Sequence, residues 1–143
     1  MPDPGESQAP PPKPRPVPDD LSRPYWEGAR EGKLVLQRCK SCGEHQFYPR
    51  PFCVACRGSD LEWVEASGRG RLHTFSVVHR TADRAFAAEV PYAFAVVELD
   101  EGPRLTVNVV DTPLDALRCD APVRMVFTDL DDRTTIPNAR GEA

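Results

Sequence analysis

The pattern of apolar and polar positions divides the chain at two glycines, Gly68 and Gly70. Beyond them, short runs rich in Val, Phe, Tyr or Thr recur between turn-forming residues, a pattern that is typical of strands. The predicted strands are Arg71 to His79, Tyr92 to Leu99, Arg104 to Val110 and Val123 to Asp129. A tight hairpin at Asp100 to Pro103 is expected between the second and third, and one helical turn at Thr112 to Leu117 between the third and fourth.

Before this boundary the pattern changes from helix to strand. Pro24 can occupy the first turn of a helix that Asp19, Asp20 or Ser22 would cap and that Gly32 would end. Tyr25, Trp26 and Ala29 share one side of this helix at helical spacing, so we expect it to dock through an aromatic patch. Strands are predicted at Lys33 to Gln37 and at Asp60 to Glu65, where Leu61, Trp63 and Glu65 alternate with Glu62 and Val64.

The first eighteen residues differ in composition from the rest of the chain. They hold eight of its 16 prolines, one β-branched residue and no aromatic residue. Such a segment buries too little surface to fold, which predicts a solvated, partly polyproline arm, with a PxxP-type ligand as the alternative. We therefore divide the chain into four parts: a disordered arm (1–18), a helix and zinc ribbon (19–67), an OB-fold (68–133) and a C-terminal tail (134–143).

The strand-rich half predicts a small barrel. Four or five short antiparallel strands in so short a chain must protect their edges, and closure into a barrel does this. The fold class is therefore mainly β, with a short N-terminal helix, a ribbon and a C-terminal OB-fold barrel. The longest loop, Arg80 to Val90, contains Phe86 and is the segment expected to contact a partner or ligand.

Composition and charge exclude several classes of protein. Hydrophobic residues make up 40% and charged residues 28% of the 143 residues, as in globular domains, and no apolar run approaches the length of a membrane helix. The formal charge is −4, with 18 basic and 22 acidic residues, whereas a binder of nucleic-acid backbones would be basic. The amino end has no apolar signal region, which predicts a cytoplasmic location.

The strongest local motif is a double pair of cysteines. Cys39 and Cys42 form one CxxC pair, and Cys53 and Cys56 form a second after a ten-residue loop. This spacing brings four thiolates onto one tetrahedral zinc ion, and four thiolates leave no open position for catalysis, so structural zinc is expected. Iron in the same sulfurs, as in a rubredoxin-like electron carrier, or a disulfide or dithiol switch, are the alternatives. The loop from Phe47 to Phe52 is expected to shield one side of the site.

The remaining reactive residues do not form a catalytic constellation. Cys119 is expected to be a partly buried free thiol, because its segment supplies no histidine base. His45 is interpreted as a solvated loop residue, and His73 and His79 as structural or surface residues. The carboxylates at positions 129, 131 and 132 are read as a solvated run. The nucleophile-elbow, phosphate-loop, HExxH and Rossmann motifs do not occur.

Several of these motifs together resemble a known family. The segments are Pro24 to Gly28, Gly32 to Gly43, Tyr48 to Arg50, Cys53 to Cys56 and Gly70 to Val78. In this order they resemble the zinc-ribbon plus OB-fold family called domain of unknown function thirty-five, over roughly residues 20 to 130. Pro91 to Leu99 matches the family's central barrel strand. Thr134 to Pro137 departs from the Arg-Pro motif with which the family often closes.

The resemblance implies a role in acyl-CoA metabolism. Members of the family accompany thiolases, thiolase-like aldolases or hydratases of steroid side-chain breakdown, and the partner carries the catalytic groups. We therefore expect a noncatalytic subunit of a thiolase-like aldolase or thiolase dimer, with two copies of each chain and a CoA thioester as the substrate of the complex. Arg80 and Arg84, which flank the longest loop, are the candidate contacts for the CoA phosphates. The rival hypotheses are a hydratase subunit and a nucleic-acid binder.

Overall fold

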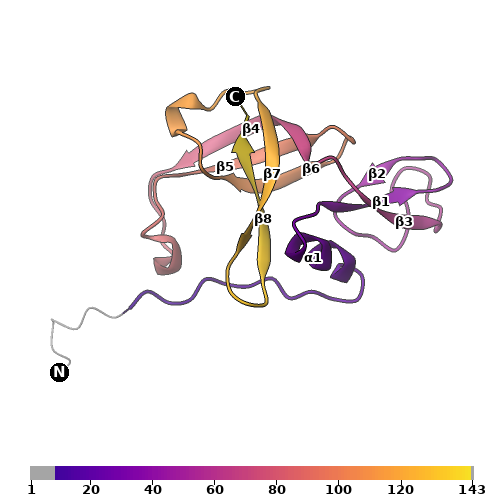
Figure 1. Ribbon diagram of the computed structural model, residues 1–143, viewed down its shortest axis with the longest axis horizontal. Helices are drawn as coiled ribbons and strands as arrows, with labels where there is room; N and C mark the ends of the chain where they lie inside the picture. Colours follow the sequence, from indigo (N-terminus) through magenta and orange to yellow (C-terminus); the bar gives the residue numbers. More distant parts are fainter. Residues whose placement is uncertain (1–8, 143) are drawn as a thin grey trace.

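The computed structural model describes residues 9–142 as one helix, a small sheet and a barrel (Figure 1). The first part of the chain forms α1 (Arg23–Arg30), β1 (Val35–Cys39), β2 (His45–Gln46) and β3 (Leu61–Glu65). The second part forms β4 (Arg69–Val78), η1 (Arg84–Phe86), β5 (Tyr92–Leu99), β6 (Arg104–Val109), η2 (Leu114–Ala116), β7 (Pro122–Asp129) and β8 (Thr135–Gly141). Strands β2, β1 and β3 make an antiparallel sheet, and the other five close a barrel in the order β4-β5-β6-β8-β7. The prediction of a mainly β chain with a ribbon and an OB-type barrel is confirmed.

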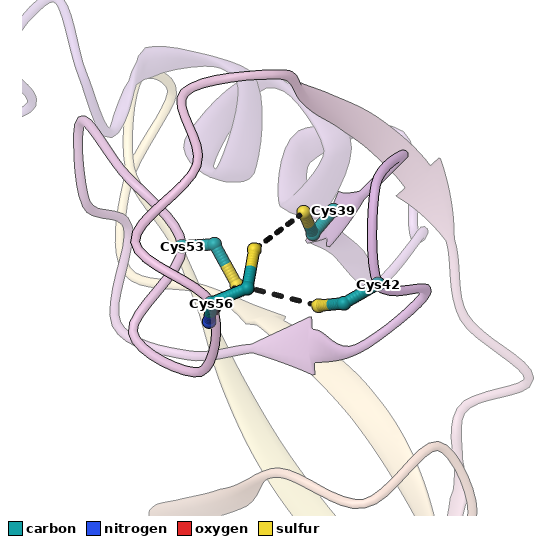
Figure 2. Close-up of side chains that lie close together, drawn as sticks. All are labelled: Cys39, Cys42, Cys53 and Cys56. Atoms are coloured by element: carbon teal, nitrogen blue, oxygen red, sulfur yellow. Dashed lines mark hydrogen bonds between the residues drawn. The ribbon is translucent and has the colours of Figure 1, made fainter.

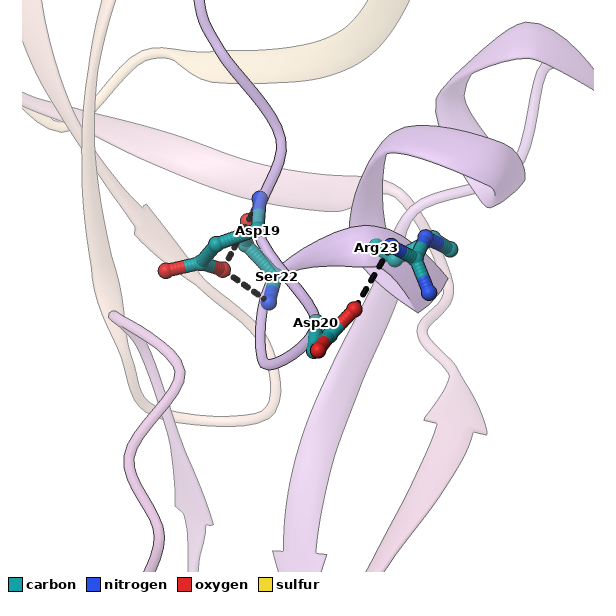
Figure 3. Close-up of polar contacts among 4 residues, drawn as sticks. All are labelled: Asp19, Asp20, Ser22 and Arg23. Carbon is teal, nitrogen blue, oxygen red and sulfur yellow. Dashed lines mark hydrogen bonds and ion pairs between the residues drawn. The ribbon is translucent and has the colours of Figure 1, made fainter.

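The start of α1 is held by a local polar turn (Figure 3). Asp19 accepts hydrogen bonds at Oδ1 from the backbone N–H of Ser22 (2.7 Å) and from its hydroxyl (2.6 Å). These bonds from Ser22 lower the pKa of Asp19. Pro24 lies in the first turn, and Gly32, with φ of +74°, follows the helix in the left-handed conformation that ends many helices.

The aromatic side of α1 is covered by the chain itself. Tyr25 and Ala29 are buried, and the Tyr25 ring lies 5.0 Å from that of Trp26 and 5.2 Å from that of Phe47. The helix also packs against β1, β7 and β8. The aromatic patch predicted for this helix therefore docks within the chain itself, against the loop between the cysteine pairs and the barrel.

The interior of the barrel follows from the alternation of buried and more exposed positions, which is most regular in β5 and β6. In β6 the side chains of Leu105, Val107 and Val109 are buried, while their neighbours face outward. β4 is the longest strand, and an irregularity between Leu72 and Thr74 lets it bend from β5 toward β7. Burial of these aliphatic side chains provides the main driving force for the barrel.

Strand β8 corrects the predicted domain boundary at residue 133. Residues 135–141 are not a tail: they pair antiparallel with β7 along their whole length and contact β6 in parallel at Val109 and Ala139. Pro137, Asn138 and Gly141 are depleted in strands, so their sequence does not predict one. Closure explains why they adopt it, since without β8 the edges of β6 and β7 would be unpaired.

Residues 9–18 have no helix or strand, and they run along the barrel past η1 and the β7–β8 turn before reaching α1 (Figure 1). Lys13 and Pro16 are half-buried in this stretch, and its other residues are exposed. The rest of the predicted arm, residues 1–8, lies outside the described residues. Within the described part of the chain, no helix is long and apolar enough to cross a membrane.

Candidate metal centre and docking surfaces

Two similar backbone turns present the four cysteines. In the first, the N–H of Gly43 donates to the carbonyl of Cys39 at 2.8 Å, and in the second the N–H of Arg57 donates to the carbonyl of Cys53 at 2.8 Å. Gly43 has φ of +80°, as its place after the first pair predicts, and Arg57 has φ of +65° at the equivalent place in the second. Each turn therefore reverses the chain directly after its second cysteine and points both sulfurs inward.

The four sulfurs converge on one point (Figure 2). Every pair of these atoms lies within 4.8 Å, and the Cys39–Cys56 and Cys42–Cys53 pairs are each 3.6 Å apart. A tetrahedral ion with sulfur ligands at about 2.3 Å separates those sulfurs by about 3.8 Å, so the donor set fits a zinc ion in both chemistry and size. Within the described residues, this is the one cluster of at least three Cys, His, Asp or Glu side chains able to hold a metal.

Backbone N–H groups favour the thiolate form at two of these positions. The backbone N–H of Cys42 lowers the pKa of the Cys39 thiol to about 7, and that of Cys56 lowers the pKa of Cys53. The sulfur of Cys56 in turn faces the N–H of Gly58 at 3.4 Å. Cys39 and Cys53 are buried, whereas Cys42 and Cys56 are at the surface. One half of the cluster is thus anchored in the fold, and the other half faces solvent.

A buried pair of glutamines holds the loop between the two turns. Gln37 and Gln46 are register partners on β1 and β2, and the Gln46 amide donates to Oε1 of Gln37 at 2.8 Å. The amide group of Gln37 makes two bonds with the backbone of Arg50, at 2.8 and 2.9 Å. That of Gln46 donates to the carbonyl of Phe52 at 3.1 Å and accepts from the N–H of Val54 at 3.0 Å. These bonds place the second cysteine pair opposite the first.

This cluster and the barrel behind it match a described family. Residues 26–62 match the domain described as ChsH2, rubredoxin-like zinc ribbon domain, and residues 63–128 match the domain described as ChsH2, C-terminal OB-fold domain. In a solved structure, the Ltp2-ChsH2(DUF35) aldolase, one chain superimposes with a TM-score of 0.80 at 35% identity. The match covers 89% of this chain and 98% of that chain. The chain belongs to the ChsH2 (DUF35) family.

Relatives of the ChsH2 family with enzyme names support the same grouping. Benzoylsuccinyl-CoA thiolase subunit BbsA of Thauera aromatica is 33% identical over 122 residues, which is 85% of this chain and 76% of the relative. The probable enoyl-CoA hydratase alpha subunit of Thermomonospora curvata is 35% identical over 125 residues. The 3-oxo-4,17-pregnadiene-20-carboxyl-CoA hydratase alpha subunit of Mycobacterium tuberculosis is 30% identical over 132 residues. The chain spans only 39% and 42% of the lengths of these two hydratase subunits.

The ChsH2-type barrel places the other predicted site residues at its surface. Arg80 follows β4 by two residues and Arg84 begins η1, and both side chains are exposed. Cys119 is exposed rather than partly buried, so that expectation is wrong: it lies in the turn between η2 and β7, outside the barrel interior. His73 and His79 are exposed, as interpreted, and His45 is half-buried at the start of β2.

The sequence of the chain did not predict a second basic surface. Arg23 and Arg30 of α1 and Arg133 of the β7–β8 turn line one cavity of about 310 Å³, together with Trp26. Arg23 also pairs with Asp20 at 2.7 Å. Arg133 lies about a hundred positions from Arg23 and Arg30 in the chain and meets them only because α1 packs beside β8, so spacing alone gives no signal.

The loop between the cysteine pairs, together with the second pair, presents apolar side chains to solvent. Tyr48, Phe52 and Val54 are 60%, 47% and 59% exposed, whereas Phe47 turns inward to Tyr25. Tyr48 and Phe52 therefore keep about half of their surface open to solvent and available to a partner. Exposed aromatic side chains of this kind mark interaction surfaces.

Proposed function

We propose that this chain is a noncatalytic accessory subunit that docks on a thiolase-superfamily aldolase or thiolase acting on an acyl-CoA, as part of steroid side-chain degradation. The observation that carries the proposal is the match to a chain of the Ltp2-ChsH2(DUF35) aldolase, because it extends over 98% of that chain. The named thiolase subunit BbsA, of which this chain covers 76%, supports the same partner class.

The chemistry of the chain agrees with a supporting role. We propose that Cys39, Cys42, Cys53 and Cys56 hold one structural zinc ion, which fixes the ribbon and supplies no reaction step, since four thiolates complete its coordination. Metal held by thiolates needs no oxidising compartment, and we place the protein in the cytoplasm. We propose that the catalytic groups belong to the partner, since the four-thiolate site of this chain has no open coordination position for a substrate.

Docking would use the apolar loop of the ribbon. Tyr48, Phe52 and Val54 provide exposed apolar surface on a loop that Gln37 and Gln46 hold in place. Aromatic side chains on a rigid support are typical of the residues that contribute most to an interface. Because thiolase-like enzymes are two-fold dimers, we propose an assembly with two copies of each chain.

Binding of the CoA end by this subunit has two candidate locations. Arg80 and Arg84 are the candidates proposed from the sequence, and Arg30 and Arg133 line the cavity beside Trp26. Guanidinium groups suit phosphates at either place. The double variants R80A/R84A and R30A/R133A, each assembled with the partner, separate them: the variant that raises the KM for acyl-CoA identifies the location. An unchanged KM in both intact complexes would show that the partner alone binds CoA.

The partner is tested by co-expression with a candidate thiolase-like aldolase or thiolase from the same genome. We expect co-purification, a light-scattering mass equal to two copies of each chain, and loss of activity when this chain is omitted. Y48S/F52S should weaken assembly, whereas R118A, an exposed change near η2, should not. A partner that is soluble and fully active alone would refute the accessory role.

A hydratase is the second candidate partner. It is favoured by the identity of 35% with a hydratase alpha subunit over 87% of this chain. The two assignments are separated by testing which enzyme is captured by the tagged chain from its native host. Tight binding of single-stranded RNA by the lone protein would instead support the nucleic-acid alternative.

A further inference from the structure

The proline-rich segment lies beside one end of the barrel face that OB-folds use for ligands, where it contacts the two loops that bound this face. In OB-folds this face is made by the second and third strands and bounded by the first and fourth loops, which correspond here to β5, β6, the 79–91 loop and the β7–β8 turn. A cavity of about 430 Å³ opens on it, with walls from Phe86, Tyr92, Val110, Leu130 and Ile136. Lys13, Pro14 and Pro16 form its remaining wall. We infer that this face is a binding site for a basic proline-rich peptide, and that residues 12–16 of the same chain are its ligand in cis.

Lys13 joins the segment to the first bounding loop. Its ammonium group pairs with the carboxylate of Glu89 and lies 5.7 Å from the centre of the Phe86 ring. Lys13 makes both an ion pair and a cation–π contact, and both of its partners belong to the 79–91 loop. These two contacts fix the position of the proline-rich segment relative to that loop. Lys13 is half-buried, as is Pro16, in a segment whose other described residues are exposed, which agrees with this fixed position.

Arg15 joins the segment to the second bounding loop. A guanidinium nitrogen of Arg15 lies 2.6 Å from Oδ2 of Asp131, a buried carboxylate oxygen. The other oxygen of Asp131 accepts from the backbone N–H groups of Arg133 and Thr134 at 2.7 and 2.8 Å. The bond from Arg133 and the charge of Arg15 help to hold the pKa of Asp131 below its usual value. Asp131 is therefore ionised in the fold and faces the segment.

The alternation of proline with basic residues matches these contacts. Prolines at 12, 14, 16 and 18 favour the polyproline conformation, which has about three residues per turn and is preformed before binding. Peptides of this kind dock in grooves lined by aromatic side chains, as Phe86 and Tyr92 line this one. Lys13 and Arg15 pair with acidic residues on the two loops, and these pairs set the position of the segment along the groove. The alternating basic and proline residues of the arm thus have a specific binding site on the barrel.

The inference is tested by charge reversal in the full chain, read by amide hydrogen exchange. In the 79–91 loop the N–H groups of Phe86 and Glu89 are hydrogen-bonded to the carbonyls of Asp83 and Phe86. K13E and E89K should each raise the exchange rate of this loop by about threefold or more, because each breaks the ion pair. The double variant K13E/E89K restores the pair with its charges exchanged, and should restore slow exchange.

The matched control is R104E, which breaks the exposed Arg104–Glu98 pair between β5 and β6. It should leave exchange in the 79–91 loop unchanged. Unchanged exchange in K13E and E89K, or no recovery in the double variant, would overturn the inference.

A second measurement does not depend on exchange. A fluorescent peptide with the sequence of residues 9–19 is titrated into the full-length wild-type protein and into full-length K13E/R15E. The wild type should bind the peptide at least about tenfold more weakly than K13E/R15E does. In the wild type the segment of the same chain competes with the peptide for the site at a high effective concentration. Equal affinity for both proteins, or undiminished binding of a peptide in which Lys13 and Arg15 are replaced by Glu, would contradict the assignment.

Discussion

Gly70 lies directly against the carbonyl oxygen of Glu98, so closely that a Cβ atom at position 70 would stand 2.4 Å from that oxygen. It would also stand 2.9 Å from Cγ1 of Val97. The Gly70→Ala variant should therefore displace β4 from β5 and reduce the free energy of unfolding by about 1–3 kcal/mol. Urea denaturation measures this. Ser76→Ala, at an exposed position of the same strand, is the control and should change stability by less than about 0.5 kcal/mol.

Gln46→Leu should loosen the ribbon even though it touches no sulfur. It removes the acceptor for the N–H of Val54 and one of the two donors to Oε1 of Gln37, so we expect a loss of about 1–3 kcal/mol in stability. We expect faster release of zinc to a colorimetric chelator. Arg38→Ala, which breaks an exposed ion pair with Glu62 on the same sheet, should release zinc at the wild-type rate.

Zinc affinity should fall as the pH falls. The ligands act as thiolates, and the pKa of Cys39, lowered to about 7 by the N–H of Cys42, leaves its thiolate form abundant at neutral pH but not below. Protons therefore compete with the metal increasingly as the pH drops from 8 to 6. Competition with a chelator of known affinity gives the slope, which should equal at least about one proton per zinc. Cys119→Ser should leave that slope unchanged, and a pH-independent affinity would count against thiolate ligation.

Removal of β8 should abolish the barrel. A chain that stops at Thr134 loses the strand between β6 and β7 and with it the buried residues Thr135, Asn138 and Ala139. Circular dichroism and urea titration should show no cooperative unfolding of the barrel. Arg140→Ala, an exposed change within β8, should retain it. A truncated chain with wild-type stability would assign residues 135–141 to a dispensable tail.

The sequence predicts those features that depend on neighbouring residues. The helix with Pro24 in its first turn, the hairpin with Gly102 at φ of +116°, and the strand bounds of β5 all follow from local preferences. The cysteine cluster was predicted for the same reason, because each CxxC pair is a short local turn and only one convergence of two such turns is needed.

Features that depend on distant segments were not predicted. β8 carries Pro137 and Asn138 and is a strand only because β6 and β7 flank it. The burial of Tyr25 depends on Phe47, which the sequence places 22 positions away, and the basic cavity needs Arg133 to meet α1. In each case the determining contact is tertiary, and no local pattern records it.

The closure of the barrel by β8 also fixes an order of events during synthesis. The ribbon is complete once β3 has emerged from the ribosome, so its cysteines can capture zinc while the barrel strands are still being made. The barrel, by contrast, cannot close before residue 141 is available, and until then β6 and β7 present unpaired edges. The nascent chain is therefore most prone to aggregate late in translation, when these strand edges are exposed. At that stage the ribbon is already folded and can contact a partner.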